Sequence, residues 1–214
     1  MPEINVDGLL FVFPEGWEVD KFDEWAFYRN QFSKQHNNIK AVDLLALERS
    51  KKTLWLIEVK DFSCHKRDKT VDLSDEIFGK IISTLAALLP AKVNASKIEE
   101  INFAKKAIRA SKIRVVFQVY QPRKPSKLFP KSFDESDLQK EFNISFKSID
   151  PHALVVDGND MPDCIPWEVR RVNFHSKCKM LGGVAEFFSE AFLCRFPPED
   201  LPRPVVYPVH SLPV

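Results

Sequence analysis

Three ionisable residues lie inside two apolar runs of the segment KAVDLLALERSKKTLWLIEVKDF, Lys40 to Phe62. Asp43 lies in the first run, and Glu58 and Lys60 lie in the second. Burying a charge without a partner is costly, and apolar neighbours on both sides predict burial here. Two acids and a base in this setting therefore indicate a site in which buried charges neutralise one another.

The two runs predict a pair of strands, over residues 39–47 and 53–62, joined by the polar turn ERSKK in an antiparallel hairpin. Alternate side chains of a strand share a face, so Glu58 and Lys60 lie about 6.5–7 Å apart on one face. Leu54 and Leu56 share that face, which argues against a surface ion pair on an edge strand. The hairpin can bring Asp43 beside Glu58.

Two carboxylates and the backbone carbonyl of Val59 form an all-oxygen set that suits Mg²⁺, with Mn²⁺ as its substitute. Without a cation, close carboxylates repel and one is driven to bind a proton. A lysine beside the metal can orient or deprotonate a bound water and screen charge on a reacting phosphate. This chemistry predicts phosphodiester hydrolysis, with Asp43 and Glu58 on the metal and Lys60 at the water.

The spacing of Asp43, fourteen residues, then Glu58-Val59-Lys60 resembles the PD-(D/E)XK, or restriction-endonuclease-like, nuclease superfamily. The expected order of helix, strand, strand, long helix and later strand is similar to its αβββαβ core over roughly residues 9–120. Val42 stands where the family often has proline. The resemblance implies an α/β fold with a central mixed sheet flanked by helices. It also implies a Mg²⁺-dependent endo- or exonuclease that acts on nucleic acid, DNA rather than RNA.

Many members of that family place a glutamate on the first helix, facing the metal. A helix is predicted over Asp20–Phe32 from its apolar spacing, and Glu24 is the candidate on it. The alternative is an acid near a helix start that the helix dipole favours. For the whole chain, the alternatives are an inactive nuclease-fold nucleic-acid-binding or scaffold protein and a partner-dependent defence or restriction effector.

Basic residues are expected to contact the phosphates of the nucleic acid. The segment from Ile101 to Phe133 holds nine basic and no acidic residues, which is typical of a phosphate-binding surface. A solvated helix face followed by a basic loop is the alternative. The residues chosen are Lys105, Arg109 and Lys112, expected on one helix face; Arg123 and Lys124 in a proline-rich loop; and Lys66, Arg67 and Lys69 after the second strand.

Two further polar residues interrupt apolar segments. Lys80 lies near Ile77 and Ile81 on a helix predicted from residue 71 to a stop at Pro90, where a snorkelling side chain is the common explanation. Gln118 lies in the strand predicted over residues 113–120, where a hydrogen-bonded core glutamine is the simpler interpretation.

The bulk composition predicts one globular domain. The chain has 214 residues, 44% hydrophobic and 29% charged, with a formal net charge of +1. Its apolar runs are shorter than the roughly 18 residues of a membrane span, and its four cysteines have no paired spacing, so we expect a cytoplasmic protein with reduced thiols and no membrane partner. Residues 1–173 are expected to form the nuclease-like domain and 174–214 an accessory helix with a flexible proline-rich tail. A homodimer or a larger defence or repair complex is the expected assembly.

Overall fold

The computed structural model describes residues 1–35, 39–62, 71–122, 125 and 131–172. The chain divides into two compact units, Met1–Ser176 and Lys177–Val214, and everything described below lies in the first. The accessory helix and tail predicted over residues 174–214 lie outside the described residues. The boundary at residue 173 therefore stays a prediction.

The described residues of the first unit form short N-terminal strands, a central hairpin and three α-helices. In chain order its elements are β1 (Glu3–Val6), β2 (Leu9–Val12), β3 (Trp17–Lys21), a 3₁₀ turn (Phe22–Glu24), a π-helical turn (Tyr28–Phe32), β4 (Leu44–Glu48), β5 (Thr53–Asp61), α1 (Leu73–Asn94), α2 (Ile98–Ala107), β6 (Lys112–Tyr120), α3 (Glu135–Ser145), β7 (Leu154–Asp157) and β8 (Glu168–Arg171).

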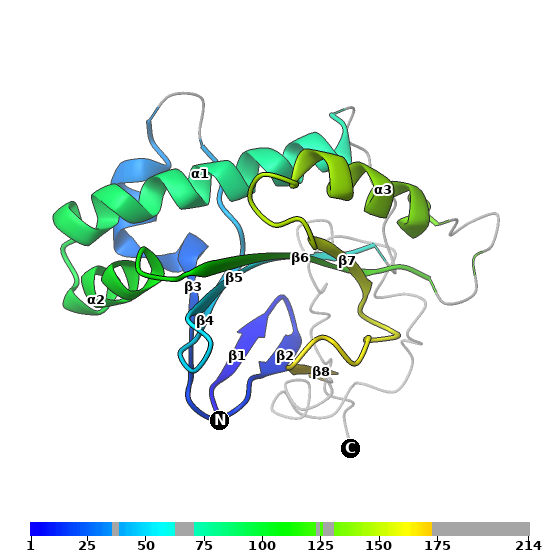
Figure 1. Cartoon of the computed structure of the whole chain (residues 1–214), viewed down its shortest axis with the longest axis horizontal. Coiled ribbons are helices and arrows are strands. Elements are labelled where there is room, and N and C mark those ends of the chain that lie inside the picture. Colours follow the sequence, from blue (N-terminus) through cyan, green and yellow to red (C-terminus); the bar gives the residue numbers. More distant parts are fainter. Residues whose placement is uncertain (36–38, 63–70, 123–124, 126–130, 173–214) are drawn as a thin grey trace, which may run out of the picture. The chain divides into compact units, whose positions relative to one another are not determined.

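A five-stranded mixed sheet in the order β3-β4-β5-β6-β7 organises the unit. Strands β3, β4 and β5 pair antiparallel, and β5, β6 and β7 pair parallel. The three α-helices lie on one side of this sheet, and the small sheet β1-β2-β8 lies on the other (Figure 1). The predicted α/β fold, with a mixed sheet, a hairpin and flanking helices, is confirmed.

Each face of the central sheet has its own apolar core, and β5 contributes to both. Leu54 and Leu56 pack with the apolar faces of α1, α2 and α3. Trp55, Ile57 and Val59 pack against the small sheet. This alternation is the period of two that the sequence predicts for a strand, so Glu58 and Lys60 lie on the helix side.

The N-terminal part differs from the sequence prediction. Residues Asp20 to Phe32 do not form one helix, because Trp17–Lys21 pairs with β4 as an edge strand and the chain then turns through two short helical segments. Tertiary contacts override the helical apolar spacing here: the Ala26 and Phe27 amides donate to the Glu100 carboxylate of α2 at 2.7 and 3.1 Å. The run Leu9–Phe13 supplies β2 of the small sheet, and the first strand of the central sheet is β3.

The helix boundaries also differ in two places. Helix α1 starts after Asp72, whose side chain caps it, but it continues past the predicted stop at Pro90 to Asn94. Ala87, Leu88 and Ala91 are buried on either side of the proline, so packing outweighs the missing amide hydrogen bond. Helix α2 ends at Ala107, so Lys112 lies in β6 and not on a helix face with Lys105.

Within the described residues, no helix is both long and apolar enough to cross a membrane.

Candidate functional site: a buried carboxylate–lysine cluster

The hairpin brings Asp43 and Glu58 together. Asp43 directly precedes β4, where Leu44 pairs with Ile57 of β5, so the register places it opposite Glu58. Asp43 Oδ2 accepts a hydrogen bond of 2.7 Å from the Val59 amide. The Asp43 carboxylate thus contacts the amide of Val59, the residue whose carbonyl was predicted to bind metal. The Glu58 side chain is fully buried.

Two lysines share a single oxygen of Glu58. Lys60 Nζ lies 2.6 Å from Glu58 Oε1, and Lys80 Nζ, from α1, lies 2.5 Å from the same atom. Glu58 Oε2 is buried and has no hydrogen-bond partner within the part of the chain that the structure describes. The cluster thus has one saturated carboxylate oxygen and one free acceptor.

Sequence reasoning missed Lys80 as a member of this cluster. Its residue is only 8% exposed, so it does not snorkel to solvent but ends on Glu58. One turn further along α1, Thr84 accepts a hydrogen bond of 3.1 Å from the Val42 amide, which holds the helix against the start of β4. The available signal was a lysine inside the apolar stripe of a helix that covers the sheet face carrying Glu58.

Burial and mutual charge shift the ionisation of the cluster. Burial raises the pKa of Glu58, and the nearby Asp43 carboxylate raises it further, while Lys80 and Lys60 oppose the shift. Burial alone would lower the pKa of Lys60, but the charges of Glu58 and Asp43 outweigh it and raise that pKa above its ordinary value. Lys60 therefore stays an ammonium ion beside the carboxylates.

A polar pocket of about 420 Å³, the Asp43 pocket, opens onto the cluster. Asp23 lines it, whereas Glu24 pairs with Lys21 at 3.3 Å and Arg29 at 3.8 Å, with half of its side chain exposed. The 3₁₀ turn thus aims Asp23 at Asp43 and places Glu24, the residue singled out from the sequence, beside two surface cations. The full lining is Asp23, Tyr28, Arg29, Ser33, Lys40, Ala41, Asp43 and Lys80.

Replacing Asp23 with asparagine is expected to stabilise the protein at neutral pH. Burial, and next the charge of Asp43, raise the pKa of Asp23 above its ordinary value of 3.8. The native state therefore holds this proton more tightly than the unfolded state, and stability contributed by the group is lost as pH rises through the raised pKa. Urea unfolding should give Asp23→Asn a higher free energy of unfolding than the wild type at neutral pH. This difference in stability should disappear as the pH falls toward about 4. A less stable variant at neutral pH would contradict this account.

The other residues proposed from the sequence lie elsewhere. Lys105 and Lys112 are exposed. Gln118 is a core residue as predicted, since it donates to the Tyr120 hydroxyl at 2.9 Å and accepts from the Trp167 indole at 3.2 Å. Five predicted phosphate contacts lie outside the described residues: Lys66, Arg67, Lys69, Arg123 and Lys124.

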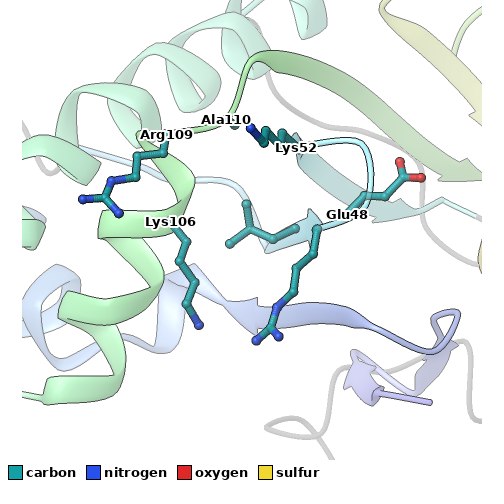
Figure 2. A pocket seen from close by; sticks show the side chains of 7 residues that line it. Glu48, Lys52, Lys106, Arg109 and Ala110 are labelled. Carbon is teal, nitrogen blue, oxygen red and sulfur yellow. The ribbon is translucent and has the colours of Figure 1, made fainter.

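A second pocket, of about 360 Å³, lies between the β4–β5 turn and the end of α2. Figure 2 shows the Lys106 and Arg109 side chains on the α2 side of this pocket and Lys52 on the side of the turn. Its lining is Leu47, Glu48, Arg49, Lys52, Lys106, Arg109 and Ala110. Sequence reasoning treated Arg49 and Lys52 only as parts of a polar turn, and the lysine and arginine content of ERSKK was the signal.

The described residues contain no group of three or more histidine, cysteine or acidic side chains able to hold a metal ion. Asp43 and the free oxygen of Glu58 are two carboxylate donors, which is the number that Mg²⁺ commonly takes from protein, because it keeps several waters. The donor chemistry therefore fits Mg²⁺ or Mn²⁺ better than Zn²⁺, which prefers sulfur and nitrogen ligands.

Comparison with known proteins gives one curated relative, from Neisseria meningitidis serogroup A / serotype 4A (strain DSM 15465 / Z2491). It is 33% identical over 209 residues, covering 79% of this chain and 30% of the relative. That relative is a cysteine–tRNA ligase. The chain spans less than a third of its length. No family model and no solved structure matches the chain.

This match corrects the functional prediction. The resemblance to PD-(D/E)XK nucleases, and the Mg²⁺-dependent phosphodiesterase acting on DNA inferred from it, are contradicted because the matched protein is a ligase. An inactive nuclease-fold protein or a defence effector finds no support in the match either. The three-residue motif recurs in unrelated settings, so it identified where charges meet but not their function. The roles assigned to individual residues stay predictions.

Proposed function

We propose that this chain is a tRNA-binding part related to an aminoacyl-tRNA synthetase, and that its Asp43 pocket holds a tRNA phosphate through a divalent cation. The observation that carries the proposal is the 33% identity to a cysteine–tRNA ligase over 79% of the chain. Because the chain corresponds to 30% of that protein, the proposal concerns tRNA binding and not the whole ligation reaction.

The charges of the pocket support a phosphate ligand. Arg29, Lys40 and Lys80 line it together with Asp23 and Asp43. Cationic side chains at such a surface position a nucleic acid through its phosphates without reading its sequence. The carboxylates of Asp23 and Asp43 would repel a phosphate that carries no cation. A divalent cation between these carboxylates and the phosphate would allow both the acidic and the basic side chains to contribute to phosphate binding.

The donor atoms for the cation are oxygens of Asp43 and Glu58, with the Val59 carbonyl as a third. Glu58 Oε2 is buried without a hydrogen-bond partner among the described residues, and an unsatisfied buried acceptor is costly unless something binds it. Lys60 and Lys80 occupy only the other oxygen, Oε1. A bound Mg²⁺ would neutralise the carboxylates and offer its remaining positions to water and phosphate.

The first test measures cation binding without RNA. Mn²⁺ should raise the thermal unfolding temperature of the wild type through preferential binding to the native state. Asp43→Asn should abolish this increase, since asparagine can still accept from the Val59 amide but lacks the negative charge. Asp163→Asn, at an exposed aspartate, is the matched control and should respond as the wild type does. An equal increase in Asp43→Asn would remove the cation from the proposal.

The second test measures binding of unfractionated tRNA, with spermidine present throughout to keep the tRNA folded. Mg²⁺ should tighten binding to the wild type, and Asp43→Asn should weaken it about tenfold or more in Mg²⁺ but not in EDTA. A DNA duplex of similar length should compete poorly. If tRNA does not bind, or if the duplex competes equally, the relation to tRNA fails.

A further inference from the structure

We infer that the pocket between the β4–β5 turn and α2 is a second RNA site, which binds one nucleotide of a single-stranded segment by its phosphate. The choice of RNA as the polyanion rests on the proposed function, but the site itself rests on charge, shape and backbone geometry at a place separate from the Asp43 cluster. Its residues are Arg49 and Lys52 on the turn and Lys106 and Arg109 on α2 and the residues that follow it.

The pocket carries an excess of positive charge. Glu18 of β3 contacts both Arg49 and Lys106, the latter at 2.8 and 2.9 Å. Although burial opposes it, these two cations hold the pKa of Glu18 below its ordinary value, so Glu18 is ionised and its charge is already matched. Lys52 and Arg109 form no ion pair with any described residue, and they remain for an external anion.

The remaining acid at the pocket does not cancel these charges. Glu48 is buried and pairs with Lys51 at 2.7 Å, and its carboxylate points away from Lys106 and Arg109 (Figure 2). Lys106 lies in the last turn of α2, where the helix dipole favours a cation. Arg49 and Lys52 come from a different element, so the dipole does not account for the cluster.

The shape of the pocket suits a nucleotide better than a free inorganic anion. Leu47 and Ala110 add apolar surface between the cationic side chains. A ribose and base can cover this surface while the phosphate meets Lys52 and Arg109, which is the usual combination of apolar walls with a few polar contacts in ligand sites.

Lys52 itself adopts a backbone conformation that a lysine would avoid. Its φ is +49°, in the left-handed region where glycine is the least strained residue. Its carbonyl accepts from the Ser111 and Lys112 amides at 2.9 and 3.3 Å, which ties the turn to the start of β6, just after the α2 side of the pocket. The hairpin turn requires a positive φ here, and the presence of a lysine in place of the less strained glycine favours a role for its side chain.

The strain makes Lys52→Gly an informative variant. It removes the ammonium group and relieves the backbone, so its thermal stability should equal or exceed that of the wild type. Binding of a fluorescein-labelled single-stranded RNA of about 12 nucleotides is measured by anisotropy in EDTA, which removes any divalent cation from the Asp43 pocket. Lys52→Gly should bind about three- to tenfold more weakly.

The salt dependence supplies a second readout. Between about 50 and 200 mM salt, the slope of log affinity against log salt should decrease by about 0.7 for the one lost phosphate contact. Arg109→Gln should act in the same direction, and the double variant should bind more weakly than either single variant. Lys147→Gly, an exposed lysine in the turn after α3, is the matched control and should leave both affinity and slope unchanged.

The outcomes separate this inference from the proposed function. If Lys52→Gly and Lys147→Gly bind the RNA equally, or if the wild type does not bind it in EDTA, the second site is overturned, whatever tRNA does in Mg²⁺. If Lys52→Gly loses affinity while Asp43→Asn binds tRNA like the wild type, the second site stands and the cation-dependent pocket fails.

Discussion

Replacing Glu58 with alanine is expected to lower the free energy of unfolding by about 3–5 kcal/mol. The substitution leaves Lys80, which is 8% exposed, without the carboxylate that lies 2.5 Å from its ammonium group. An unpaired buried cation must either lose its proton or draw water into the core, and both outcomes cost stability. Lys60 loses the same partner, but it is close enough to solvent to be hydrated.

Urea unfolding followed by tryptophan fluorescence measures this loss. Glu141→Ala, at an exposed glutamate of α3, is the control and should change stability by no more than about 0.5 kcal/mol. The double variant Glu58→Leu with Lys80→Met should recover most of the loss, because a buried ion pair replaced by apolar side chains is often neutral in stability. A loss below about 1 kcal/mol in Glu58→Ala would show that the ion pair does not stabilise this core.

The second large effect on stability is expected at Glu100, whose carboxylate binds backbone amides of the segment between β3 and β4. This buried carboxylate of α2 accepts from the Ala26 amide at 2.7 Å and from the Phe27 amide at 3.1 Å. Hydrogen bonds to a charged group contribute about 1.5–3 kcal/mol each. Glu100→Ala removes two such bonds and should therefore lower the free energy of unfolding by about 3–6 kcal/mol. It should also loosen the segment that carries Asp23 and Arg29 to the Asp43 pocket.

Amide hydrogen exchange distinguishes this local effect from a general one. In Glu100→Ala, the Ala26 and Phe27 amides should lose more protection than those of β5, because they alone lose their acceptors. Glu100→Gln retains one oxygen acceptor and should lose about half as much stability. Glu99→Ala, at the exposed neighbour on the same helix, should be close to the wild type. Unchanged protection at both amides in Glu100→Ala would mean that the carboxylate does not hold this segment.

Local geometry explains which parts of the site the sequence could predict. The strand period alone placed Glu58 and Lys60 on one face with Leu54 and Leu56, and the hairpin brought Asp43 to them, as the 2.7 Å bond to the Val59 amide shows. Antiparallel pairing through a short turn leaves few registers that bury these apolar residues on the correct face. The Asp72 cap of α1 was predictable for the same reason, since it depends on residues next to one another in the chain.

Long-range contacts explain where the structure of the site differs from the sequence prediction. The choice between Asp23 and Glu24 depended on the helix expected over Asp20–Phe32, and the pairing of Trp17–Lys21 with β4 replaced its start by a strand and a 3₁₀ turn. A shift of this kind changes which of two adjacent side chains faces the pocket. Lys80 joined the cluster because α1 packs across the face of β5, and no spacing rule connects residues 22 positions apart on different elements.

The α/β class, the hairpin and the meeting of Asp43, Glu58 and Lys60 could be inferred from the amino-acid sequence, because they follow from the strand period and from burial of neighbouring side chains. Long-range packing, in contrast, places Lys80 in the cluster and Asp23 at its pocket, and it arranges a second pocket lined by Arg49, Lys52, Lys106 and Arg109. Packing between distant elements sets these relations, since each residue alone is compatible with a solvated surface. The meeting of Asp43, Glu58 and Lys60 therefore follows from local structure. What this cluster can bind depends on the residues that distant elements of the fold bring to it.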